Sequence, residues 1–159
     1  MPQLRVYTLT FRAGLHIGRH GIGQEKVLAH IPADTLFSAL VSVRQAWQGG
    51  GGEWAARFQD HPPFRLTSAF PYAGGVRFFP RPLQMPSGAA EGIDPKRWRK
   101  IRYVSEAVLR KLLSGSLPQA WLPAAPGEEP ADGLTLQGGT LWLSKDEVGL
   151  LPESMRARP

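Results

Sequence analysis

The sequence has 159 residues and contains no cysteine, which excludes disulfide bonds and thiolate metal sites. A chain without cysteine fits a cytosolic protein. It has no apolar run of membrane-spanning length, and Met1 is not followed by a signal-peptide pattern. We therefore expect a cytoplasmic protein that has no membrane partner.

Residues typical of catalysis are scarce as well. The four histidines, at positions 16, 20, 30 and 61, lack the spacing of metal ligands, and no phosphate-binding loop, Ser/His/Asp arrangement or dinucleotide fingerprint occurs. His16 lies beside a glycine-rich turn and is a candidate general base for RNA cleavage. A histidine in such a loop more often has a structural role or contacts a phosphate. We therefore expect no catalytic residue, no bound metal and no cofactor.

What the sequence does contain is an excess of positive charge. Lysine and arginine number 19 against 13 acidic residues, and the net charge of +6 favours an anionic partner such as nucleic acid. Hydrophobic residues make up 42% of the chain, which is enough for a folded core. The 18 glycines and 15 prolines predict many loops.

Residues 31–40, with the sequence Ile-Pro-Ala-Asp-Thr-Leu-Phe-Ser-Ala-Leu, predict the sharp start of a helix that ends at residues 49–52. Pro32 cannot continue a preceding helix. Asp34 is a good N-cap, because its carboxylate can accept a backbone N–H of the first turn. This helix would bury a stripe of apolar residues, namely Leu36, Leu40, Val43 and Trp47.

The first turn of this helix also carries polar groups. Asp34, Thr35 and Ser38 lie outside the apolar stripe, next to the N–H donors and the positive end of the helix dipole. Such a corner can hold a phosphate. An ordinary capped helix explains the same residues, so both interpretations stay open at this point.

Strand-like segments precede and follow this helix. They span residues 4–12, 65–70, 76–79, 101–104, 134–137 and 140–143. Turn residues at 71–75 and 138–139 predict two hairpins, one joining 65–70 to 76–79 and one joining 134–137 to 140–143. A further helix is predicted over 106–114 with Ser105 as its N-cap, residues 49–52 are expected to form a connector, and residues 145–151 a short helix or turn. Residues 4–12 are apolar on both faces, which predicts a central strand covered on both sides. This order of elements predicts an α+β, ferredoxin-like (RRM-like) domain with helices packed on an antiparallel sheet.

The strongest binding signal is a basic segment. Its positive residues are Lys96, Arg97, Arg99, Lys100 and Arg102. They can follow a phosphate backbone, while Trp98 and Tyr103 offer faces on which unpaired bases could stack. A solvated charged surface is the alternative, but the mixture of cations with aromatic residues favours RNA binding.

Five short motifs occur in order: Gly-Leu-His-Ile-Gly at 14–18, Ile-Pro-Ala-Asp-Thr-Leu-Phe-Ser-Ala-Leu at 31–40, Ser-Ala-Phe-Pro-Tyr at 68–72, Phe-Phe-Pro-Arg-Pro at 78–82 and Lys-Ile-Arg-Tyr-Val-Ser at 100–105. Together they resemble the RAMP-type subunit of type III-A CRISPR (Csm) effector complexes that holds the 5′ handle of the crRNA. One departure is Ala33, where the family commonly has serine. A contact at that corner would have to come from a backbone N–H, Thr35 or Ser38.

The resemblance implies a non-catalytic subunit. It would clamp the 5′ handle of the crRNA and bridge the large cyclase/polymerase-like subunit to the backbone RAMP subunit. Members of this family are longer and carry a second ferredoxin-like half. Residues 1–159 would then form one N-terminal RAMP domain, with residues 83–99 as a thumb-like insertion and with the C-terminal half absent.

The resemblance and the basic segment together imply a set of RNA-binding residues: His16, Gly18, Ala33, Asp34, Thr35, Ser38, Phe70, Pro71, Pro80, Lys96, Arg97, Arg99, Lys100, Arg102 and Ser105. Two alternatives stay open. One is a repeat-processing endoribonuclease of the same superfamily, with His16 as its base. The other is the equivalent handle-binding subunit of a III-B or III-D complex, or a protein-only scaffold, and the identity of the partners separates these from the favoured interpretation.

Overall fold

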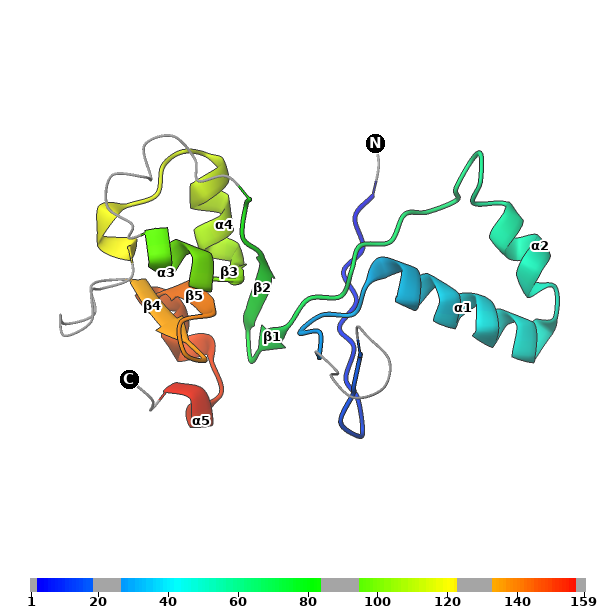
Figure 1. Cartoon of the computed structure of the whole chain (residues 1–159), viewed down its shortest axis with the longest axis horizontal. Helices are drawn as coiled ribbons and strands as arrows, with labels where there is room; N and C mark the ends of the chain where they lie inside the picture. The colour runs from blue at the N-terminus through cyan, green and yellow to red at the C-terminus, as the bar shows by residue number, and fades with distance from the viewer. Residues whose placement is uncertain (1–2, 19–26, 84–94, 123–132, 157–159) are drawn as a thin grey trace. The chain divides into compact units, whose positions relative to one another are not determined.

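The computed structural model describes residues 3–18, 27–83, 95–122 and 133–156 (Figure 1). The chain divides into two units, Met1–Ala69 and Phe70–Pro159, called unit 1 and unit 2 below. Each is described by itself. The prediction that residues 1–159 form one RAMP domain stays a prediction. Most of the predicted insertion at 83–99 lies outside the described residues, apart from residue 83 and the helical residues 95–99.

The described residues of unit 1 form two helices, α1 (Ala33–Gln48) and α2 (Gly51–Ala56). Gly49 and Gly50 connect them with φ angles of 68° and 67°, in the left-handed region that glycine adopts without a steric penalty. The two glycines therefore end α1 where the sequence predicted and let α2 begin almost at once. Residues 51 and 52, expected to lie in a connector, belong to α2.

Aromatic side chains gather where α2 and the following segment meet α1. The rings of Phe37 and Trp54 stack with their centroids 5.8 Å apart. Phe58 lies edge-on to both Phe37 and Phe64, at 4.9 Å in each case. Offset and edge-to-face pairs of this kind add to the free energy of burial. These contacts hold the described helices of unit 1 together.

The start of α1 differs from the prediction by two residues. Pro32, with φ −58° and ψ 147°, is the N-cap and offers no side-chain hydrogen bond. Asp34 instead lies inside the first turn, where its Oδ1 accepts the backbone N–H of Thr35 at 2.7 Å. The prediction of Asp34 as the N-cap is therefore wrong, because the extended backbone of Pro32 already makes the turn into the helix.

Two predictions about burial in unit 1 are also wrong. Trp47, on the expected apolar stripe, has 83% of its surface exposed, and Leu40 and Val43 are exposed as well. Residues 4–12 form no strand, and Leu4 is 88% exposed. A strand requires a hydrogen-bonded neighbour, and no segment among the described residues pairs with this one.

The predicted strand over residues 65–70 is reduced to one isolated bridge. Ala69 and Ile31 exchange two backbone hydrogen bonds, with N···O distances of 2.9 and 3.0 Å. The rest of that segment has no regular structure. The bridge holds the entry to α1 against the end of unit 1, so the segment stabilises a loop and not a sheet.

Unit 2 is built on a five-stranded sheet in the order β1-β2-β3-β5-β4 (Figure 1). The strands are β1 (Tyr72–Ala73), β2 (Val76–Pro80), β3 (Tyr103–Ser105), β4 (Gly133–Leu136) and β5 (Leu141–Ser144). Three neighbouring pairs are antiparallel, whereas β3 and β5 run parallel. The predicted α+β class is confirmed, and the sheet is compatible with a ferredoxin-like RAMP fold. The expectation of a wholly antiparallel sheet is wrong at one pair.

The parallel pair follows from a crossover between β3 and β5. Parallel neighbours cannot be joined by a tight hairpin, so the chain must return to the same end of the sheet. It does so through α4 (Glu106–Leu113), the short 3-10 helix η2 (Gln119–Trp121) and β4. The predicted cap is confirmed, because the Ser105 hydroxyl accepts the N–H of Val108 at 3.3 Å.

Both predicted hairpins are present, and one is shifted along the chain. The hairpin of β4 and β5 turns at Gly138 and Gly139, as the sequence predicted. The other turns at Gly74 and Gly75, but its first strand is the two-residue β1 and not residues 65–70. The last elements among the described residues are the 3-10 helix η3 (Lys145–Leu150), predicted as a short helix or turn, and the helix α5 (Glu153–Arg156).

Unit 2 has a core on each face of its sheet. Side chains alternate along a strand, so Leu141 and Leu143 of β5 face one cluster while Trp142 faces the other. The first cluster is covered by Val148 and Met155 after β5, among others. The second lies under α4 and under α3 (Pro95–Lys100). All four residues of β5 are buried, so it is the strand around which unit 2 packs.

One carboxylate is hydrogen-bonded to the last residues of both β3 and β5. Glu147 Oε2 accepts hydrogen bonds from the Ser105 hydroxyl at 2.5 Å, the Ser144 hydroxyl at 3.1 Å and the Ser144 N–H at 3.0 Å. Both serines are almost completely buried. Buried hydroxyls without an acceptor are costly, so one glutamate satisfies the ends of β3 and β5 together.

We predict that Glu147→Ala lowers the free energy of unfolding of unit 2 by about 2 kcal/mol, because two buried hydroxyls lose their acceptor. Urea unfolding followed by the near-ultraviolet circular dichroism of the buried tryptophans measures this change. Asp146→Ala, at the exposed neighbouring position, is the control and should have little effect. Equal effects of the two variants would contradict the role of Glu147.

Candidate nucleic-acid interface

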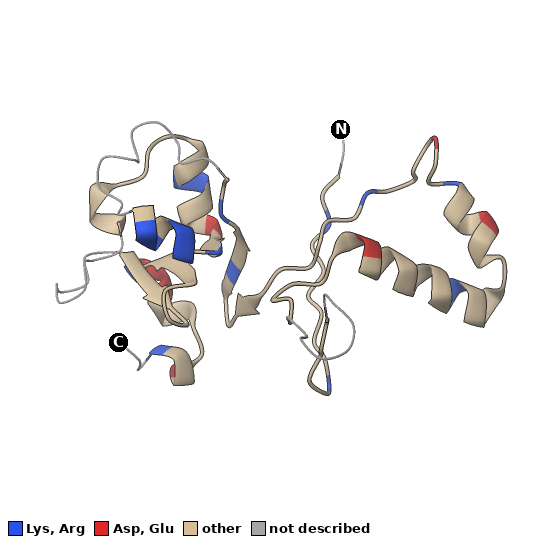
Figure 2. Ribbon diagram, in the orientation of Figure 1, with Lys and Arg blue, Asp and Glu red and all other residues tan. Residues whose placement is uncertain are grey.

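The basic segment folds into a helix that the sequence did not predict. Helix α3 has the sequence Pro-Lys-Arg-Trp-Arg-Lys, and Figure 2 shows lysine and arginine along it. Trp98 faces the sheet with 7% of its surface exposed, while Lys96, Arg99 and Lys100 are exposed. The helix therefore separates one apolar anchor from a set of cations that face outward.

Two aromatic contacts hold the anchor in place. The ring of Trp98 meets Trp142 edge-on, with centroids 6.5 Å apart and an interplanar angle of 83°. Trp142 is fully buried, and its indole N–H donates to the carbonyl oxygen of Trp121 at 2.9 Å. Ile101, directly after α3, is buried in the same cluster. Helix α3 therefore packs on the outside of this core cluster through Trp98.

The two aromatic residues expected to stack on bases are not available for it. Trp98 and Tyr103 are each 7% exposed, and they belong to the two different core clusters. Burial raises the pKa of the Tyr103 phenol, and the nearby charge of Arg102 partly opposes this. The prediction of stacking platforms is wrong, because the alternation of β3 and the packing of α3 turn both rings inward.

Three of the predicted cations present their charge to solvent. Arg99, Lys100 and Arg102 are exposed, and their side chains make no hydrogen bond or ion pair with any described residue. The backbone beneath them is fixed, because the N–H groups of Arg102 and Tyr103 both donate to the Thr140 carbonyl, at 2.8 and 3.1 Å. This arrangement can attract phosphate groups without first breaking an internal contact.

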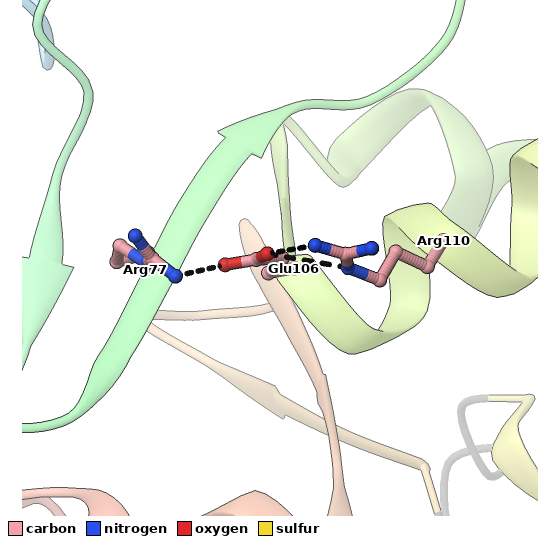
Figure 3. A network of polar contacts seen from close by, with 3 residues as sticks. All are labelled: Arg77, Glu106 and Arg110. Atoms are coloured by element: carbon pink, nitrogen blue, oxygen red, sulfur yellow. Dashed lines mark hydrogen bonds and ion pairs between the residues drawn. The ribbon is translucent and has the colours of Figure 1, made fainter. Parts of the chain in front are cut away.

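Other arginines of unit 2 are committed to a carboxylate. Figure 3 shows Glu106 between Arg77 of β2 and Arg110 of α4. The N···O distances are 2.6 Å to Arg77 and 2.7 Å to Arg110. The hydrogen bond from Arg110, aided by the charge of Arg77, holds the pKa of Glu106 below its ordinary value. These ion pairs link β2 to α4, so Arg77 and Arg110 are not part of the basic surface.

The handle-binding residues expected in unit 1 lie near the start of α1 and before it. Asp34, Thr35 and Ser38 are exposed in the first turns, and Ala33 is half-buried. Asp34 accepts the N–H of Thr35, so that donor is already used. The chain before α1 holds the exposed His16 and Gly18, and Gly18 forms an isolated bridge with Val27.

The remaining predicted residues lie in unit 2. Phe70 is half-buried with its ring 6.3 Å from that of Phe79. The Pro71 carbonyl accepts the N–H of Phe78 at 3.0 Å, and Pro80 ends β2 opposite Tyr103. Ser105 is fully buried as a helix cap and hydrogen-bonded to Glu147, so its hydroxyl is not at the surface of unit 2.

Among the described residues no group of three or more histidine, cysteine, aspartate or glutamate side chains could hold a metal ion. In the same part of the chain, no helix is long and apolar enough to cross a membrane. The candidate interface is therefore defined by its cations: Lys96, Arg97, Arg99, Lys100 and Arg102.

The fold and this surface define an α+β domain of RAMP-compatible type with a cationic helix on its core. Comparison with known proteins narrows the class. The chain is 32% identical, over 101 residues, to the proteins named CRISPR system Cms protein Csm4 in two strains of Mycobacterium tuberculosis. The match covers 64% of this chain and 32% of each relative. It confirms the resemblance to Csm-type RAMP subunits predicted from the motifs. No protein-family model and no solved structure matches the chain.

The Glu106 network makes a prediction about acid stability. The pKa of Glu106 is lowered in the folded state, so its ion pairs stabilise unit 2 at pH values above its ordinary pKa of 4.5. This contribution to stability is lost as the pH falls through the lowered pKa. Glu106→Gln should therefore flatten the fall in unfolding free energy on acidification. Urea unfolding at a series of pH values measures it, with Glu153→Gln as the control. An unchanged pH dependence in Glu106→Gln would contradict the assigned ion pairs.

Proposed function

We propose that this chain is the RNA-holding part of a Csm4-type subunit in a type III CRISPR effector complex. In this proposal it binds the 5′ handle of the crRNA and cuts no RNA. The observation that carries the proposal is the row of exposed cations on and after α3, mounted on a buried tryptophan pair. The similarity to the Csm4 proteins supports the choice of RNA as the anion.

The chemistry of the surface favours the sugar-phosphate backbone over the bases. Lysine and arginine neutralise phosphates and release counterions, so such binding weakens steeply as salt rises. Trp98 and Tyr103 are buried and supply no stacking face. Arg99, Lys100 and Arg102 would then position a strand, while recognition of the handle itself would need further contacts.

Those further contacts are proposed at the other predicted residues. The hydroxyls of Thr35 and Ser38, exposed near the start of α1, are suited to accept or donate hydrogen bonds to a nucleotide. In unit 1, His16, Gly18, Ala33 and Asp34 are proposed as further contacts. In unit 2, Phe70, Pro71 and Pro80 are proposed as contacts, and Lys96 and Arg97 would add charge. The buried hydroxyl of Ser105 is left out of this set.

The proposed partners are the other subunits of the complex. As a Csm4-type subunit, the chain would contact the large cyclase/polymerase-like subunit and the backbone RAMP subunit in the cytoplasm. The exposed apolar side chains of unit 1, including Leu4 and Trp47, support an assembly role, since extended apolar surface is typical of contact regions. The matched region makes up 32% of the length of each curated relative.

The proposal is tested with labelled crRNA, with and without its 5′ handle, at two salt concentrations. We expect tighter binding of the RNA that carries the handle, and no cleavage after prolonged incubation. Cleavage that is lost in His16→Ala would favour the endoribonuclease alternative. Equal affinity for both RNAs would contradict handle binding and leave only a basic scaffold.

A single substitution tests the basic surface. Lys100→Ala should weaken RNA binding and lower the slope of log Kd against log salt by about one, because one phosphate contact is lost. Lys145→Ala, which removes an equal charge at an exposed position of η3, is the matched control. A slope that is unchanged in Lys100→Ala, or reduced equally in both variants, would contradict the assigned contact.

A further inference from the structure

The side chain of Arg81, directly after β2, is turned toward the end of α3, whereas Arg99 and Arg102 are exposed. Its Nε donates to the Ile101 carbonyl at 2.7 Å, and one terminal nitrogen donates to the Pro82 carbonyl at 3.0 Å. The guanidinium carbon lies 4.8 Å from the centroid of the Trp98 ring. Its backbone N–H also donates to the Arg102 carbonyl at 3.1 Å. One residue therefore contacts the end of α3 at several points.

Helix α3 needs such an anchor because its own sequence disfavours it. It has six residues, which is too short for an isolated helix to be stable in water. Lys96 and Lys100 are four positions apart on it, and like charges at this spacing repel. The last carbonyls of a helix also lack internal partners. Arg81 satisfies the Ile101 carbonyl there and places a positive charge at the negative end of the helix dipole.

We propose that Arg81 is the positioning residue of the basic surface, and that it contacts no RNA. It holds α3 against the sheet before RNA arrives, so that the cations are already ordered when the phosphates bind. Ordering a segment only on binding costs affinity, and a preformed array avoids that cost. This inference rests on the proposed function, because it concerns the same surface.

The planar fork of arginine makes the inference testable with a conservative change. Arg81→Lys keeps the charge but loses the guanidinium geometry that joins the Ile101 carbonyl to the Trp98 ring. We expect the Kd for handle-bearing crRNA to rise about three- to tenfold, the range that corresponds to the net loss of one ordinary hydrogen bond. The slope of log Kd against log salt should stay unchanged in Arg81→Lys and in Arg81→Ala.

Amide hydrogen exchange separates positioning from general destabilisation. In Arg81→Lys without RNA, residues 96–102 should exchange faster than in the unaltered chain, and RNA should restore their protection. Protection of β5 at Leu141–Ser144 should not change. Arg77→Lys is the matched control, because it changes the other arginine of the β2 segment, which pairs with Glu106. It should leave both the RNA affinity and the exchange of α3 unchanged.

Three other outcomes would contradict the proposed role of Arg81. A reduced salt slope in Arg81→Ala would make Arg81 a phosphate ligand, and an unchanged affinity in Arg81→Lys would remove its role. Faster exchange of β5 would show a purely structural effect. Failure of the unaltered chain to prefer the handle would instead overturn the proposed function. The exchange of free α3 would still report whether Arg81 anchors the helix.

Discussion

The indole of Trp142 is the contact on which most of unit 2 depends. It is fully buried in β5, packs edge-on against Trp98 of α3 and donates its N–H to the Trp121 carbonyl. A single side chain thus joins the buried strand β5, the basic helix and the segment that crosses over from α4. Because its polar atom has a partner, the large ring is buried without an unsatisfied donor. The basic surface is consequently fastened to the core and is not a separate appendage.

The described arginines of unit 2 lie in different environments that a count of charges cannot distinguish. Arg77 and Arg110 share the carboxylate of Glu106, Arg81 covers the ring of Trp98, and Arg102 points to solvent. The state of each depends on which acceptor lies within reach in the folded chain. Only a solvent-exposed arginine such as Arg102 suits an external anion, so the surface proposed to bind RNA is smaller and better defined than the total charge implies.

Unit 1 shows where local patterns succeed and where they fail. The glycines at 49 and 50 end α1 as expected, because a left-handed backbone is a property of the residue itself. The burial of Trp47 and the strand over 4–12 were predicted wrongly. Both need a second surface to pack or pair against, and hydrophobic periodicity says nothing about whether the described chain supplies that surface.

The sequence by itself determined helices α1 and α4, the Ser105 cap, the β4–β5 hairpin, the cluster of cations and the resemblance to Csm-type RAMP subunits. These features depend on the chemistry of residues a few positions apart. Only the tertiary structure decided that Trp98 and Tyr103 are buried, that Arg81 turns inward and that β3 pairs in parallel with β5. Those outcomes depend on residues from distant parts of the chain, such as Trp142 and Thr140, which meet α3 and β3 only after folding.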